Sequence, residues 1–155
     1  MRTRYPVAAH IFLLKADTVL LLRRANTGYE DGNFGVVAGH VELGEPVRQA
    51  ALREIQEEVG VMVQPADLQP VGVMHRLSDE ERIDFFLVTR QWTGEPVNAE
   101  PKKCSEIYWC SLNALPENTI PYIRQALLNF QAGIWYDEFG WETPLNNVSI
   151  LSRSR

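Results

Sequence analysis

The sequence has few cysteines, no long apolar run and no secretory signal. Cys104 and Cys110 are the only cysteines. The pattern places both on one strand, about 20 Å apart when extended, which is too far for a disulfide, so we expect reduced structural thiols. No apolar stretch approaches the roughly 20 residues of a membrane-spanning helix. Because the N-terminal segment also lacks a small-residue cleavage site, we expect a cytoplasmic protein.

Basic residues are in the minority too. The chain carries 15 Lys and Arg against 20 Asp and Glu, for a net charge of −5 at pH 7. A general nucleic-acid binder needs a basic stripe to meet the phosphates, so the charge argues against that class. An acidic protein can still bind a small polyphosphate if metal ions stand between the two sets of negative charge.

Hydrophobic periodicity predicts an α+β fold, and a chain of 155 residues fits one domain. Helices are predicted at residues 46–59, with Pro46 at the first helical position and Gly60 as the cap beyond the end, and at about 121–131. Residues 27–35 are expected to form a loop. Strands are predicted at residues 7–15, 19–23, 34–38, 68–77, 83–91 and 105–111, the first two as a hairpin. The pattern indicates a sandwich around a mixed sheet.

Residues 133–155 carry four aromatic residues without a clean period: Trp135, Tyr136, Phe139 and Trp141. We expect these aromatics to pack the tail onto the domain rather than to form a ligand-binding box. The tail could also serve a homodimer.

Three glutamates share one face of the first predicted helix. Glu54, Glu57 and Glu58 are related as i, i+3 and i+4. Like charges at these spacings repel each other, and no lysine lies between residues 54 and 60 to offset them. Arg53 is the nearby cation and could clamp Glu45 or orient a neighbouring glutamate. Clustered carboxylates suit Mg²⁺ or Mn²⁺, which prefer oxygen ligands.

The segment before this helix is rich in glycine. Gly39 and Gly44 let the backbone pass close to a ligand. A carbonyl at Ala38 or Gly39 could then supply a further metal ligand. The alternative is a glycine turn that leads into an acidic surface helix.

Residues 39–61 match every fixed position of the Nudix box, Gly-x5-Glu-x7-Arg-Glu-U-x-Glu-Glu-x-Gly-U, in which U is aliphatic. Seven fixed residue types would coincide by chance on the order of once in 10⁸ starting positions. Residues 22–25, 92–96 and 108–109 also resemble the MutT branch of this family. The resemblance covers about residues 5–131 of the chain. It implies the Nudix α/β/α sandwich with a central mixed β-sheet.

The resemblance also implies a metal site and the residues that build it. Mg²⁺, or Mn²⁺ as a substitute, would be held by five residues: Ala38 through its carbonyl, Glu54, Glu57, Glu58 and Glu100. Glu54 or a nearby acid would assist the attacking water. Glu45 and Arg53 would hold the loop and the helix together.

Substrate-binding residues follow the family pattern less closely. Asn118 would correspond to an asparagine that reads a guanine-like base, but it precedes Pro121 by three residues rather than two. The segment at residues 35–39 departs from the branch's Glu-Phe-Pro-Gly-Gly. Arg23 and Arg24 could reach a phosphate or a base carbonyl, although arginines at a strand end are more often solvated.

The function that the resemblance implies is hydrolysis of a phosphoanhydride bond in a nucleotide. The leading hypothesis is cleavage of a nucleoside triphosphate, such as an oxidised or modified deoxynucleotide, to monophosphate and pyrophosphate. ADP-ribose, a nucleotide sugar, a dinucleoside polyphosphate and a capped RNA end stay open as substrates. A module that binds a nucleotide without cutting it would be expected to lose box glutamates, and all are kept here.

Other polar residues are expected to be structural. His10 and His40 lack a cysteine or histidine partner at metal-ligand spacing. Residues 74–76 and 79–81 could line the way into a site, but we expect ordinary loop and edge residues.

Overall fold

The computed structural model describes residues 2–141. The helices are α1 (Val47–Val59) and α2 (Pro121–Ala132), with a short 3-10 turn, η1 (Pro65–Asp67). The strands are β1 (Val7–Lys15), β2 (Thr18–Arg24), β3 (Phe34–Gly35), β4 (Val37–His40), β5 (Gln69–Leu77), β6 (Glu81–Thr89), β7 (Cys104–Ser111) and β8 (Tyr136–Phe139). They form a mixed sheet in the order β3-β2-β1-β6-β5-β8, with β4 beside β1 and β7 beside β2.

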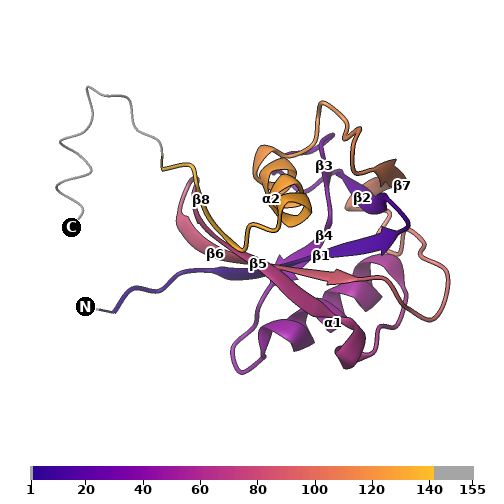
Figure 1. Cartoon of the computed structure of the whole chain (residues 1–155), viewed down its shortest axis with the longest axis horizontal. Helices are drawn as coiled ribbons and strands as arrows, with labels where there is room; N and C mark the ends of the chain where they lie inside the picture. Colours follow the sequence, from indigo (N-terminus) through magenta and orange to yellow (C-terminus); the bar gives the residue numbers. More distant parts are fainter. Residues whose placement is uncertain (1, 142–155) are drawn as a thin grey trace.

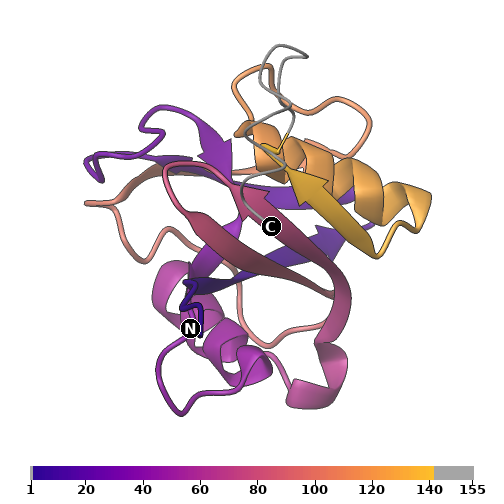
Figure 2. The same ribbon diagram turned by 90° about the vertical axis from the view of Figure 1, so that its left-hand side faces the viewer.

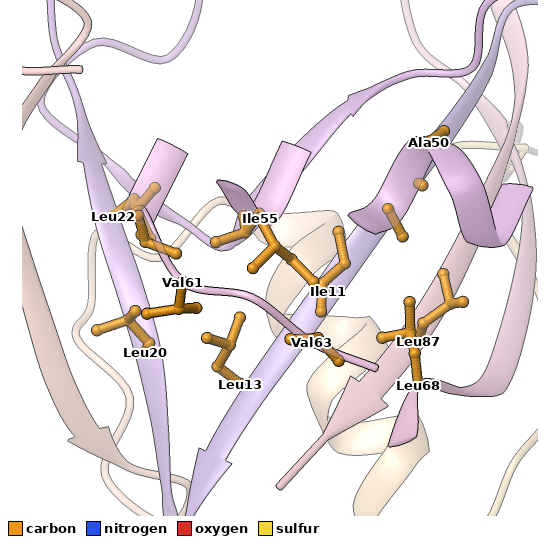
Figure 3. Close-up of a cluster of buried hydrophobic side chains, with 14 of the residues drawn as sticks. Ile11, Leu13, Leu20, Leu22, Ala50, Ile55, Val61, Val63, Leu68 and Leu87 are labelled. Atoms are coloured by element: carbon orange, nitrogen blue, oxygen red, sulfur yellow. The ribbon is translucent and has the colours of Figure 1, made fainter. Parts of the chain in front are cut away.

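The sheet has a helix on each face, as Figures 1 and 2 show. Side chains along a strand point alternately to the two faces of the sheet, so β1 contributes residues to both hydrophobic cores. Ile11 and Leu13 join the cluster under α1, whereas Phe12 and Leu14 join the cluster under α2. Figure 3 shows the first cluster, in which Ile55 of α1 lies close to Ile11. The α/β/α sandwich expected from the sequence is confirmed.

The helix α1 carries its apolar residues on the face that meets the sheet: Ala50, Ala51, Ile55 and Val59. It begins at Val47, one residue later than expected, because Pro46 keeps an extended backbone (φ −64, ψ 153). Gly60 ends the helix in the left-handed conformation (φ 72) and donates its N–H to the Gln56 carbonyl. The predicted cap at Gly60 is confirmed.

One edge of β1 is shared between two strands. β4 pairs with β1 over Ala8–Ile11, and β2 pairs with it only at Leu14 and Lys15, so the predicted hairpin is confirmed but is short. The chain changes its partner strand at Val36, from β2 to β1. The strand predicted at residues 34–38 is therefore two short strands, because β3 pairs with β2 and β4 pairs with β1.

The strand β8 lies in the tail, where the sequence predicted no strand. It pairs in parallel with β5, and its four residues are too few to show a period. This pairing makes β5 an interior strand. The expectation of loop and edge residues at 74–76 is therefore wrong, since Met74 is 1% and Arg76 3% exposed.

The tail aromatics pack less closely than expected. Trp141 donates its Nε1–H to the His75 carbonyl at 2.9 Å. Trp135 and Tyr136, by contrast, are 53% and 55% exposed. The expectations for residues 142–155 lie outside the described residues.

Cys104 and Cys110 are both free and buried, as predicted. Among residues 2–141, no helix combines the length and the apolar character that a membrane crossing requires. The expectation that residues 1–155 form one domain stays a prediction.

Candidate functional site

Arg53 ties the segment before α1 to the acidic face of the helix. Its Nε and Nη2 donate to the two carboxylate oxygens of Glu45, at 2.9 and 3.0 Å. Nη2 also donates to the His40 carbonyl at 3.1 Å, and Nη1 donates to Glu54 Oε1 at 2.7 Å. Arg53 lowers the pKa of Glu45 to about 2, and Glu45 raises the pKa of Arg53. The loop and the helix are thus joined through one guanidinium.

Gly39 allows this part of β4 to lie directly against the helix. A Cβ atom at position 39 would overlap the carboxyl group of Glu54. The absent side chain therefore leaves the space that the Glu54 carboxylate occupies.

Glu58 is partly buried beside Glu54. Its Oε2 accepts a hydrogen bond from the Ala38 N–H at 3.1 Å. Burial raises the pKa of Glu58 well above its usual value, and the Glu54 carboxyl raises it further. The Glu57 side chain is 52% exposed and lies 3.5 Å from Arg53 Nη1. A cation among these carboxylates would offset both their burial and their repulsion.

Glu100 reaches the same place from the loop between β6 and β7. The loop runs along the last turn of α1, where Val97 N–H donates to the Val59 carbonyl at 3.0 Å and Ala99 N–H donates to the Glu58 carbonyl at 3.1 Å. The carboxylate of Glu100 adds to the rise in the pKa of Glu58. Two backbone hydrogen bonds therefore bring this distant glutamate next to the helix.

The side chains of Glu54, Glu57, Glu58 and Glu100 line one cavity of about 510 Å³, whereas Glu45 and Arg53 lie outside its lining. Small-molecule sites typically span roughly 300–1,000 Å³, so the cavity suits such a ligand. Its acidic lining residues are Glu42, Glu54, Glu57, Glu58 and Glu100. Its basic lining residues are Arg23, Arg24, Arg76, Arg82 and Lys103. Negative and positive groups thus share one cavity, as binding of a metal and a polyphosphate together would require.

The donors of the acidic wall are all oxygen atoms, which fits a hard divalent cation. Among residues 2–141, no three Asp, Glu, His or Cys side chains stand close enough to form a ready-made metal site. Arg53 and the Ala38 N–H hold two of the carboxylates, whereas the exposed Glu57 is free to turn. The donor set therefore fits a divalent cation in its chemistry and requires side-chain movement to surround one.

Arg23 and Arg24 line the cavity, and each also donates a hydrogen bond to the loop after β2. Arg23 Nε donates to the Gly32 carbonyl at 2.8 Å, and Arg24 Nε donates to the Tyr29 carbonyl at 2.7 Å. Asn118 Nδ2 donates to the same Gly32 carbonyl at 2.9 Å. Asn118 does not belong to the described residues that line the cavity. The structure thus brings the two arginines to the cavity but not Asn118.

A buried polar network at the cavity was not predicted from the sequence. Asp84 Oδ1 lies 3.0 Å from His10 Nε2, and Asp84 Oδ2 accepts from Arg76 Nε at 2.7 Å. Arg76 also lies over the Tyr122 ring, 3.6 Å from its centroid. Burial alone would raise the pKa of Asp84, but His10 and Arg76 outweigh it and lower the pKa to about 2. His10, Arg76 and Tyr122 line the cavity.

The sequence did carry one signal of this network. His10 and Asp84 each interrupt an apolar run, and a buried ionisable residue is costly unless it is paired. The parallel pairing of β1 with β6 sets Ala8 opposite Asp84 and His10 opposite Phe86, which makes the two side chains neighbours. Neither apolar run indicates by itself the register in which β1 pairs with β6.

Comparison with known proteins covers most of the chain. A family model described as NUDIX domain matches residues 4–130. The 8-oxo-dGTP diphosphatase of Escherichia coli strain K12 is 28% identical over 122 residues, which is 79% of this chain and 92% of that protein. The NAD-capped RNA hydrolase NudC of Pseudomonas aeruginosa strain LESB58 is 30% identical over 106 residues, or 68% of this chain. The chain spans only 36% of that protein.

A crystal structure of a MutT NUDIX hydrolase from Burkholderia pseudomallei resembles this protein, with a TM-score of 0.75 and 26% sequence identity. The similarity covers 81% of this chain and 98% of the other. A MutT protein from Methanosarcina mazei Go1, at 19% identity and a TM-score of 0.71, shares the fold over 85% of this chain and 96% of its own.

Proposed function

Because this chain belongs to the Nudix family of hydrolases, whose members generally need a divalent metal ion, we propose that it cleaves a nucleoside triphosphate to monophosphate and pyrophosphate. An oxidised or modified deoxynucleotide is the proposed type of substrate. The similarity to the Escherichia coli 8-oxo-dGTP diphosphatase, which extends over 92% of that protein, supports this choice.

One observation carries the proposal: four glutamates from α1 and the loop after β6 line a cavity that basic side chains also line. We propose that Mg²⁺, or Mn²⁺ in its place, binds to the acidic part of this cavity. Its ligands would be Glu54, Glu57, Glu58, Glu100 and the carbonyl of Ala38. When bound, a divalent cation neutralises the charge that the phosphates and the carboxylates bring together.

The remaining residues have positioning and binding roles in this proposal. Arg53 and Glu45 keep the helix in register with the loop before it, because their two hydrogen bonds fix both side chains. Glu54 or a nearby acid is the proposed acceptor of the proton that the attacking water loses. We propose that Arg23 and Arg24 contact the phosphates of the substrate, because both residues line the cavity.

A second candidate substrate is a nucleoside diphosphate linked to another group, such as the end of a capped RNA. The similarity to a NAD-capped RNA hydrolase favours this candidate, but the chain spans 36% of that protein. A cytoplasmic location and a homodimer stay predictions. We do not propose base binding by Asn118, because the described lining of the cavity does not include this residue.

A substrate screen separates the candidates. Purified full-length protein would be incubated with Mg²⁺ and, in turn, a nucleoside triphosphate, ADP-ribose, a nucleotide sugar, a dinucleoside polyphosphate and NAD-capped RNA. Cleavage of a triphosphate between its α and β phosphates is expected to release pyrophosphate. Release of pyrophosphate from none of the triphosphates, with turnover of another compound, would overturn the triphosphate proposal. Tight nucleotide binding without any turnover would instead indicate a non-catalytic module.

A further inference from the structure

His10 lines the cavity and has a buried ring nitrogen without a partner among the described residues. Among residues 2–141, two buried side-chain nitrogens have no hydrogen-bond partner, His10 Nδ1 and Arg82 Nε, and both residues line the cavity. His10 is 2% exposed. An unsatisfied buried polar group costs about 1–3 kcal/mol, so such a group at a cavity is a candidate contact for a ligand or an ordered water.

Asp84 decides which kind of hydrogen bond His10 Nδ1 can make. An ionised carboxylate only accepts hydrogen bonds, so His10 Nε2, at 3.0 Å from Asp84 Oδ1, carries the proton. In the neutral imidazole, Nδ1 is then an acceptor. The ring is held in place by Phe86, stacked at 4.9 Å, and by Tyr122, edge-on at 5.5 Å. The direction of the Nδ1 lone pair is therefore fixed.

Arg76 supplies fixed hydrogen-bond donors on the lining of the same cavity. Asp84 holds its Nε at 2.7 Å and its Nη2 at 3.4 Å, and Tyr122 packs against the face of its guanidinium. A guanidinium has five N–H groups, so several remain for a ligand. One buried carboxylate thus orients both an acceptor and a set of donors on the cavity lining.

A ligand that matches these groups has a hydrogen-bond donor beside an acceptor along one edge. Two arguments favour a ring N–H as the donor and a carbonyl as the acceptor. Arginine most often reads a base through carbonyl and ring-nitrogen acceptors such as those of guanine. Adenine is typically read by asparagine or glutamine, and no such side chain is found in the part of the cavity lining that the structure describes.

We propose that His10 and Arg76 read the nucleobase of the substrate, and that the preferred bases carry a ring N–H next to a carbonyl, as guanine, hypoxanthine, uracil and thymine do. The ring N–H donates to His10 Nδ1, and the carbonyl accepts from Arg76. This assignment rests on the proposed function, because it concerns the base of the nucleotide whose phosphates meet the acidic part of the cavity.

The first test compares base preference in matched variants. The kcat/KM of wild-type protein would be measured with GTP, ITP, UTP, ATP and CTP, and then for His10→Phe, which keeps a ring but removes Nδ1. The ratio of kcat/KM for GTP over ATP is expected to fall at least about tenfold. His75→Phe is the control, since His75 lies on β5 outside the cavity lining, and its ratio should stay unchanged. An unaltered ratio in a folded His10→Phe protein would overturn the proposal.

The second test needs neither turnover nor a variant. GMP, IMP and AMP would be titrated into wild-type protein labelled with ¹⁵N-histidine, without added metal. GMP and IMP are expected to shift the His10 Nδ1 resonance, whereas AMP is not. Failure of the proposed function would appear as this shift without any triphosphate hydrolysis. Failure of the base assignment would appear as hydrolysis in which the His10 resonance responds equally to all three nucleotides or to none.

Discussion

The carboxyl group of Glu54 fills the space that a Cβ atom at Gly39 would occupy. This contact joins β4 to α1 at the first residue of the Nudix box. Arg53 donates a hydrogen bond to the same carboxylate. The glycine therefore matters for the position of a functional side chain rather than for an unusual backbone angle.

Gly39→Ala should consequently displace Glu54. Because a shift of about 1 Å in a catalytic group can cost about 100-fold, we expect kcat to fall by about that factor while the protein stays folded. Steady-state kinetics and circular dichroism would measure the two effects. Gly72→Ala, in β5 and away from the cavity, is the matched control. An active Gly39→Ala enzyme would show that the Glu54 position is not critical.

Glu57→Gln should abolish metal-dependent turnover with little change in stability. The Glu57 side chain is 52% exposed, so the fold does not depend on its charge. We expect kcat to fall at least about 100-fold at saturating Mg²⁺. Glu117→Gln, at an exposed loop position, serves as control. A near-normal rate for Glu57→Gln would remove this residue from the metal site.

Asp84 should make the protein lose stability in acid. Its pKa is about 2 in the folded protein, below the value of about 3.9 expected when unfolded. Its contribution, about 2–3 kcal/mol, is therefore fully present above roughly pH 5 and is lost as the pH falls towards 2. Urea unfolding between pH 7 and pH 3 should show this decline, with a shallower slope for Asp84→Asn. Parallel curves for the two proteins would contradict the assignment.

Asn118→Ala should weaken nucleotide binding without changing base preference. The amide holds the Gly32 carbonyl at 2.9 Å, which Arg23 also holds at 2.8 Å, so its loss loosens the loop that carries Tyr29. We expect KM to rise about fivefold for every base, the equivalent of one hydrogen bond of about 1 kcal/mol. Asn113→Ala is the control. A change confined to guanine nucleotides would instead indicate direct contact with the base.

Local patterns predicted well the helix that carries three of the candidate site residues. Glu54, Glu57 and Glu58 belong to one helix, and helical geometry fixes their relative positions once the helix is known. The start and the end of α1 were predicted within one residue, because Pro46 and Gly60 act through their own backbone angles.

Contacts between distant segments were harder to predict. The His10–Asp84 pair depends on the register of two parallel strands, and the two residues are 74 positions apart in the sequence. No local pattern encodes that register. Likewise, β8 exists because it pairs with β5, not because its four residues favour a strand. The break at Val36 follows from a change of partner strand, which residues 34–38 alone do not reveal.

The attachment of the β6–β7 loop to α1 has an evolutionary consequence. Main-chain atoms of Val97 and Ala99 make the attachment, so most substitutions in this stretch leave it intact. Insertions or deletions are a different matter, because they would break the pairing with Val59 and Glu58 and carry Glu100 away from its partners. Related enzymes should therefore tolerate changes of side chain at positions 97 and 99 while conserving the number of residues between Val97 and Glu100, and length changes should gather nearer to β6.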